Sequence, residues 1–107
     1  ANSITLTSVD DVQEMAVRVT NADGILADSY SYQWYKDLGA RNIGNVETVS
    51  EEDEPIANAN SAVLRVGETT SIGASGIGNY YYCKVTRTLN GKNTIATSES
   101  IYLGKSY

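Results

Sequence analysis

The chain has 107 residues, which is enough for one domain with one hydrophobic core but too few for two. Thirteen acidic residues outnumber eight basic ones, so the net charge is −5 and no basic cluster suits a nucleic-acid backbone. No apolar run approaches the roughly 20 residues that a membrane-spanning helix needs. We therefore expect neither nucleic-acid binding nor membrane insertion.

Valine, isoleucine, threonine and tyrosine recur in alternation with polar residues along most of the chain, which is typical of β-strands. The segment 9–19 comes closest to a helical period. However, Val17 and Val19 alternate with Arg18 and Thr20, and this favours a strand. The expected strands, in chain order, are 4–6, 13–20, 29–36, 61–66, 79–88 and 92–103, and 43–49 could form a short edge strand.

Turn signals separate these strands. A turn is expected at 21–24, and a corner rich in glycine, serine and threonine at 67–78. Asn90-Gly91 is the strongest short hairpin signal, because a type I′ turn needs positive φ at both central residues. In the last strand, strict alternation would place Glu99 on the same face as four residues expected to point inward. Because an unpaired buried carboxylate is costly, we expect a bulge near Glu99 or a local opening of the core to water. The four inward residues are Ile95, Thr97, Ile101 and Leu103.

Two short runs of residues could form a catalytic or metal-binding motif, but neither matches the residue pattern that such a motif requires. The run 51–55, Glu-Glu-Asp-Glu-Pro, reads as a solvated loop; the alternative is a calcium site, but the spacing and glycine of an EF-hand loop are missing. The run 73–78, Gly-Ala-Ser-Gly-Ile-Gly, has isoleucine where a nucleophile elbow needs glycine, and no helix is expected after it. The chain has no histidine, the commonest general base and metal ligand. We expect no enzyme, no cofactor and no metal site.

Short strands separated by turns, each with one apolar face, must bury those faces against each other in two layers. The sequence therefore predicts an all-β fold, a two-sheet antiparallel sandwich of about seven to eight strands in a single domain spanning 1–107. The chain has one cysteine, so no intramolecular disulfide can form.

Three segments resemble the immunoglobulin-like domains. They are Tyr-Gln-Trp-Tyr-Lys at 32–36, Ser-Ala-Val-Leu-Arg-Val at 61–66, and Tyr-Tyr-Cys-Lys-Val at 81–85. The resemblance covers essentially the whole chain. It implies an immunoglobulin-like sandwich in which the hydroxyl of Tyr81, two residues before Cys83, bonds backbone a few residues upstream.

The chain departs from this family at the cysteine bridge. Members usually pair the cysteine at the position of Cys83 with one on an earlier strand, where Val19 stands here. Cys83 is therefore expected to be a buried free thiol that serves packing rather than chemistry. The expected core residues are Val17, Val19, Trp34, Leu64, Tyr81, Cys83 and Val85.

Period-two alternation gives two candidate binding surfaces. If Trp34 and Cys83 point inward, then Gln33, Tyr35, Tyr82 and Lys84 share the outer face of one sheet. The second candidate is the hairpin tip, since loop tips carry recognition in this architecture. The tip residues are Leu89, Asn90, Gly91, Lys92 and Asn93.

The sequence of 32–36, in a chain that lacks the disulfide, is similar to that of modules found in bacterial surface proteins and on tailed-phage particles. The resemblance implies a non-catalytic interaction or display module on a bacterial cell or phage particle, extracellular, with an adhesive, spacer or decoration role. Its partner would be a protein or a surface glycan, and self-association is an option. Two alternatives stay open, namely a structural component of a virion or filament and an accessory carbohydrate-binding module.

Overall fold

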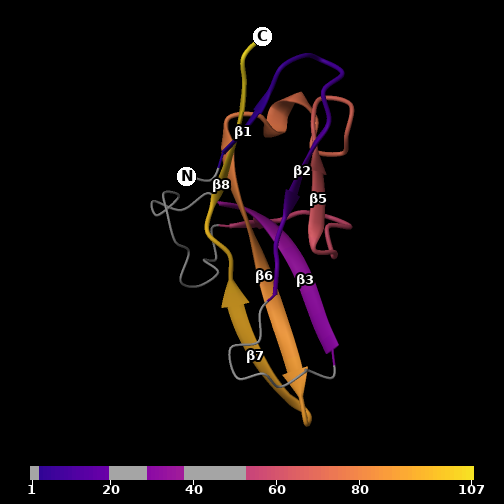
Figure 1. Cartoon of the computed structure of the whole chain (residues 1–107), viewed down its shortest axis with the longest axis vertical. Coiled ribbons are helices and arrows are strands. Elements are labelled where there is room, and N and C mark those ends of the chain that lie inside the picture. The colour runs from indigo at the N-terminus through magenta and orange to yellow at the C-terminus, as the bar shows by residue number, and fades with distance from the viewer. Residues whose placement is uncertain (1–2, 20–28, 38–52) are drawn as a thin grey trace.

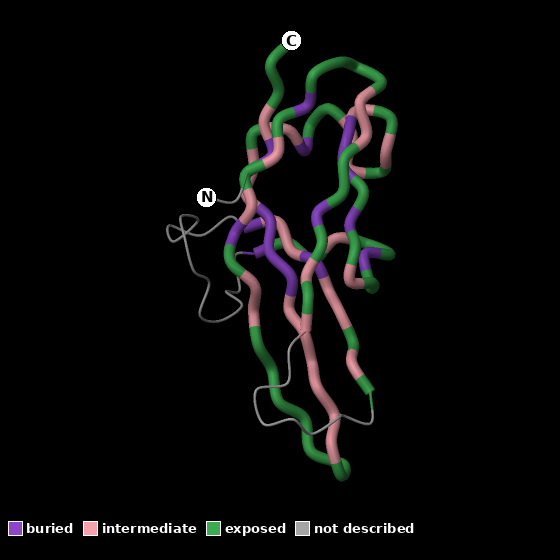
Figure 2. The backbone as a smooth tube through the Cα atoms, in the orientation of Figure 1, coloured by how far each residue is buried: buried purple, intermediate pink, exposed green. Residues whose placement is uncertain are grey.

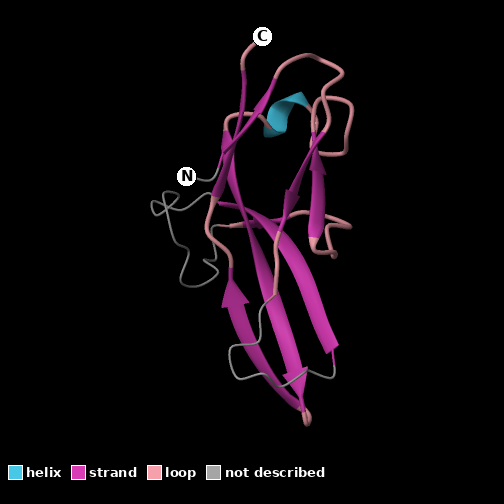
Figure 3. Cartoon of the chain, viewed as in Figure 1, coloured by secondary structure: helices cyan, strands magenta, loops and turns pink. Residues whose placement is uncertain are grey.

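A computed structural model of the chain describes residues 3–19, 29–37 and 53–107. The expected edge strand at 43–49, the expected turn at 21–24, and Glu51 and Glu52 of the acidic run lie outside the described residues. The described part forms two β-sheets and one short 3-10 helix, η1 (Ala74–Gly76) (Figures 1 and 3). Its strands are β1 (Ser3–Leu6), β2 (Gln13–Ala16), β3 (Ser29–Asp37), β4 (Glu54–Pro55), β5 (Val63–Val66), β6 (Asn79–Leu89), β7 (Lys92–Thr97) and β8 (Ile101–Lys105).

The larger sheet has six strands in the order β1-β8-β6-β3-β4, and β7 also pairs with β6. The smaller sheet is the antiparallel pair β2-β5. One pairing corrects the fully antiparallel prediction, because β1 runs parallel to β8 with Ser3 opposite Tyr102 and Leu6 opposite Lys105. β1 leads directly to β2 in the other sheet, so no hairpin ties it to β8 and its direction is not forced.

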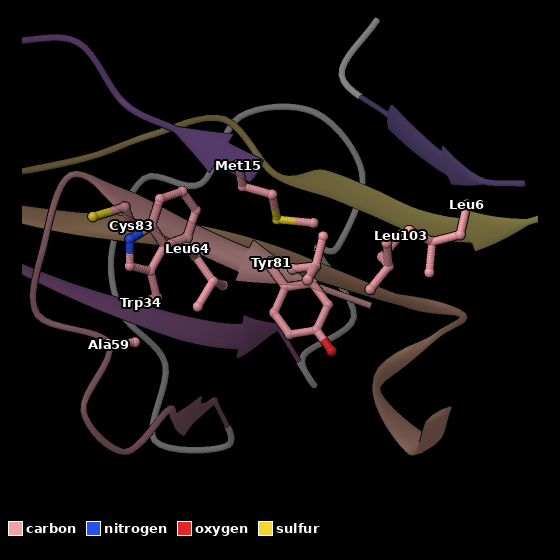
Figure 4. Packing of buried hydrophobic residues seen from close by; sticks show 9 residues of the cluster. Leu6, Met15, Trp34, Ala59, Leu64, Tyr81, Cys83 and Leu103 are labelled. Carbon is pink, nitrogen blue, oxygen red and sulfur yellow. The ribbon is translucent and has the colours of Figure 1, made fainter. Parts of the chain in front are cut away.

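The two sheets enclose one core, as the all-β two-layer prediction requires (Figures 2 and 4). Trp34 on β3 lies opposite Cys83 on β6, and both side chains are 0% exposed. The smaller sheet contributes Met15, Leu64 and Val66 to the same cluster. Cys83 is a buried free thiol.

Trp34 also fixes the chain that follows β4. Its indole N–H donates a hydrogen bond to the carbonyl of Ser61 at 2.9 Å, and its backbone N–H donates to the carbonyl of Ala59 at 3.1 Å. A buried indole N–H needs such a partner. One side chain therefore joins the core to the segment that leads into β5.

Tyr81 makes the hydrogen bond that the resemblance implies. Its hydroxyl donates to the carbonyl of Gly76, five residues upstream, at 2.7 Å. Glycine is required there, because a Cβ atom on Gly76 would overlap the side chain of Ile72 and lie 2.8 Å from the Tyr81 hydroxyl. The glycine-rich corner thus packs around one buried tyrosine.

The bulge predicted near Glu99 is confirmed. Between the pairs Tyr81↔Ile101 and Lys84↔Thr97, β6 has two residues while the opposing chain has three, namely 98–100. Ser98 bridges the irregularity, since its N–H donates to the Cys83 carbonyl and its hydroxyl accepts from the Cys83 N–H, both at 2.9 Å. Glu99 is exposed.

The extra residue also inverts the faces of the flanking strands, because side chains alternate with period two. Ile101 and Leu103 on β8 lie on the core side, opposite Tyr81 and Asn79. Ile95 and Thr97 on β7 lie on the other side, opposite Thr86 and Lys84. The prediction that Ile95 points inward is therefore wrong, and its side chain is 61% exposed.

The turn between β1 and β2 depends on Asp11. Its carboxylate accepts hydrogen bonds from the Thr7 N–H and the Gln13 side-chain amide, each at 2.9 Å. These bonds, the Thr7 backbone bond first, lower the pKa of Asp11 below its ordinary value of 3.8.

We predict a small pH-dependent contribution to stability from Asp11. Because its folded pKa is depressed, the contribution is present above the unfolded value and is lost as pH falls through the folded value. Asp11→Asn should remove this dependence, measured as the free energy of unfolding in urea near neutral pH and below about pH 4. Asp10→Asn, at the exposed neighbour, is the control; equal behaviour of the two variants would contradict the prediction.

Candidate binding surface

The side of the larger sheet that faces away from β2 and β5 is called the outer face. Gln33 pairs with Lys84 and Tyr35 with Tyr82 across β3 and β6, on the side opposite to Trp34 and Cys83. The fold therefore brings together the four residues of the first candidate surface. How many of them a partner could reach depends on what covers them.

Two tyrosines and a lysine form the centre of the outer face. The rings of Tyr35 and Tyr82 are stacked, with centroids 5.5 Å apart and an interplanar angle of 10°. The Lys84 ammonium lies 5.9 Å from the centroid of the Tyr35 ring, within reach of a cation–π attraction. This layer holds Tyr35 and Lys84 in fixed positions on rigid strands.

Tyr82, by contrast, is not available to a partner, since it is 0% exposed. Its hydroxyl donates a 2.5 Å hydrogen bond to the carboxylate of Asp53, which is 6% exposed. The solvated-loop prediction for 51–55 is therefore wrong at Asp53, and Glu54–Pro55 form β4 on the edge of β3. The described residues contain no group of three or more side chains suited to hold a metal ion.

Gln33 is also used within the fold. Its amide nitrogen donates to the carbonyls of Trp34 and Ile56, both at 2.8 Å, and its amide oxygen accepts from Asn60 at 2.9 Å. Gln33 therefore fastens the segment after β4 to β3. Of the four predicted residues, the half-buried Tyr35 and Lys84 are left to contact a partner.

The second candidate surface is the β6–β7 hairpin tip. Asn90 and Gly91 have φ values of 53° and 75°, which agree with the predicted turn, and Leu89 pairs with Lys92 across it. The hairpin extends past β2 and β5 along the long axis of the molecule, which measures 48 Å (Figure 1). Leu89 is half-buried and 90–93 are exposed. A binding role for the tip stays a prediction.

The remaining predicted core residues differ in depth. Val17 and Val85 are half-buried and pack against the core cluster. Val19 is half-buried and lies outside that cluster. β2 ends at Ala16, and Met15 is the β2 residue in the cluster. The packing expected from Val19 is therefore supplied by Met15, four residues earlier in the chain.

We predict that the Cys83 thiol of the folded protein is inert. Burial raises its pKa to about 11, so little thiolate exists near neutral pH. Native protein should react with iodoacetamide much more slowly than protein unfolded in urea, as followed by mass spectrometry. Equal rates in the two states would contradict the burial of the thiol.

Sequence reasoning missed Ile95 as a surface residue and one feature of the charge distribution. The stretch 79–97 contains Lys84, Arg87 and Lys92 but none of the thirteen acidic residues, so it carries +3 while the rest of the chain carries −8. Counting charge segment by segment would have found this asymmetry. The exposure of Ile95 was missed because the prediction kept one inward face on both sides of the expected bulge, whereas one inserted residue inverts that face.

Searches of family models, curated proteins and solved structures found nothing that matches this chain. Across 3–19, 29–37 and 53–107, no helix has the length and apolar character needed to cross a bilayer. The fold defines an all-β domain of two packed sheets without a disulfide.

Proposed function

We propose that the chain is a non-catalytic, immunoglobulin-like interaction or display module on the surface of a bacterial cell or phage particle. Support for the immunoglobulin-like part comes from topology. In the immunoglobulin fold, strands C, F and G are neighbours in one sheet, and strands B and E pair in the other. By order along the chain, β3, β6 and β8 would correspond to C, F and G, and β2 and β5 to B and E. Here β6 lies between β3 and β8, and β2 pairs with β5. The Tyr81 hydrogen bond to Gly76 also agrees with the tyrosine corner.

The interaction role depends on one observation, the arrangement of Tyr35, Lys84 and Ile95 on the outer face. Tyr35 stacks against the ring of its buried cross-strand neighbour Tyr82, and the Lys84 ammonium lies 5.9 Å from the Tyr35 ring centroid. Ile95 projects from β7 with 61% of its surface exposed. Aromatic, cationic and apolar groups on rigid strands suit protein recognition, because little side-chain entropy is lost on binding.

The tyrosines give less support to a carbohydrate-binding module, which would present a flat, exposed aromatic platform. Only Tyr102 and Tyr107 of the eight tyrosines are exposed. Tyr102 is inclined at 54° to Tyr80. Tyr107 lies beside Lys105 at the chain terminus.

Binding of the fluorescently labelled domain to intact bacterial cells and purified tailed-phage particles tests the proposal. We expect wild-type protein to bind at least one such surface and the double variant Tyr35→Ala, Lys84→Ala to lose that binding while staying folded. Val63→Ala, an exposed position on the other sheet, is the matched control. Equal binding by both variants would reject the outer face, and the absence of binding to every cell and particle would reject the role.

A further inference from the structure

The outward edge of β7 has backbone groups that pair with none of the described strands. Among the described strands, β7 pairs only with β6. A two-residue hairpin loop makes Leu89↔Lys92 a hydrogen-bonded pair, and every second pair after it is of the same kind. The N–H and C=O groups of Asn93 and Ile95 therefore point away from β6.

Two other edges in the described part of the chain are protected, whereas no described residue protects the outward edge of β7. The Val17 N–H bonds to the Ala62 carbonyl, so the backbone of Val63 points away from β2. There the Ser61 hydroxyl accepts from the Val63 N–H at 3.3 Å and donates to its carbonyl at 2.7 Å. β4 is only two residues long and contains Pro55. β7 has six residues, no proline and one charged residue, Lys92, at its start.

Side chains and charge indicate what kind of strand would fit this edge. Lys92 projects on the core side of the sheet and Ile95 on the outer face. A neighbouring strand would therefore place acidic residues beside Lys92 and apolar residues beside Ile95, in alternation. The charge of +3 on 79–97 favours an anionic partner and opposes the approach of an identical hairpin.

We propose that the β7 edge accepts an extended, acidic segment of a partner protein as an additional strand of the larger sheet. Backbone bonds to Asn93 and Ile95 hold the segment, and Lys92 and Ile95 select its two faces. This inference rests on the proposed interaction role and names the class of partner and the place where it binds.

A synthetic peptide tests the inference. The probe is acetyl-Glu-Val-Glu-Ile-Glu-Val-Glu-amide, and binding is followed by amide chemical shifts of the ¹⁵N-labelled protein. We expect shifts centred on Asn93 and Ile95 that weaken as salt is raised. A peptide with lysine in place of each glutamate should bind about tenfold or more weakly. The acidic peptide N-methylated at alternate residues should not bind, because its donors toward β7 are blocked.

Variants of the protein make the test specific. Ile95→Pro removes an outward N–H without breaking a bond to β6, and it should abolish binding of the acidic peptide. If that variant unfolds, Lys92→Glu serves in its place. It should weaken binding of the acidic peptide and strengthen binding of the lysine peptide. Thr69→Ala, an exposed position in the loop after β5, is the control that should leave binding unchanged.

Several outcomes would overturn the inference: no peptide binding, equal binding of the acidic and lysine peptides, or shifts centred elsewhere. Concentration-dependent shifts of Asn93 and Ile95 without peptide would show that the occupant is a second copy of the chain, and would overturn it as well. None of these outcomes changes the expected binding of the domain to cells and particles through Tyr35 and Lys84. Failure of the β7-edge proposal can therefore be distinguished from failure of the proposed function.

Discussion

Replacing Trp34 with alanine is expected to lower the free energy of unfolding by about 3–5 kcal/mol. Trp34 is 0% exposed and belongs to a cluster that draws on both sheets, so its removal leaves a cavity that rigid strands cannot close. The change also removes the donor to the Ser61 carbonyl. Domains of this size have a total stability of only about 5–15 kcal/mol. The variant should therefore be close to unfolding at room temperature.

The measurement is urea unfolding followed by far-UV circular dichroism, because Trp34 is the only tryptophan and its fluorescence is lost with it. Trp34→Phe separates the two effects. It keeps an aromatic ring but not the N–H, and should cost less than alanine. The exposed change Ile95→Thr is the control and should stay within about 0.5 kcal/mol of wild type. A loss below about 1 kcal/mol for Trp34→Ala would contradict the central position of the indole.

Replacing Tyr82 with phenylalanine is expected to lower the free energy of unfolding by about 2–3 kcal/mol, although only one oxygen atom is removed. That oxygen donates to the buried carboxylate of Asp53, and a hydrogen bond to a charged group is stronger than one between neutral groups. The bond joins the centre of the larger sheet to the residue that precedes β4. Its loss should also speed amide exchange at Ile56, whose N–H donates to the Trp34 carbonyl.

A double-mutant cycle with Asp53→Asn isolates this contact. We expect the double variant to be less destabilised than the sum of the two single variants, with a coupling of about 1–3 kcal/mol. Tyr80→Phe is the matched control, since Tyr80 projects from β6 on the same side as Tyr82 and contacts Tyr102. Strict additivity, or an equal cost for Tyr80→Phe, would show that the Tyr82–Asp53 hydrogen bond contributes nothing to stability.

The buried faces of the two central strands could be predicted, because the residue patterns that indicate them lie within short segments of the sequence. Alternation around Trp34 and Cys83 gave the buried faces of β3 and β6, and Asn90-Gly91 gave the hairpin. The cost of burying Glu99 was enough to place the bulge, because the penalty belongs to one residue and does not depend on its neighbours.

It was less predictable which residues of the candidate surface are accessible to a partner. Gln33 and Tyr82 are on the expected face, yet both are engaged by a segment more than twenty residues away in sequence. Asp53 and Ile56 gave no sign of this, since an acidic run before a proline looks the same whether it lies in solvent or along a strand edge. Such contacts arise only when distant segments meet.

The sequence by itself determined the strand class, the absence of a disulfide, and the burial of one indole and one thiol between two layers. Period-two alternation and residue chemistry are properties of short segments, so they can be recognised without knowing which distant segments pack beside them. The tertiary structure alone decided the parallel pairing of β1 with β8, the burial of Tyr82 against Asp53, and the exposure of Ile95. Each of these depends on register between distant strands, and a single inserted residue turns a buried face into an exposed one.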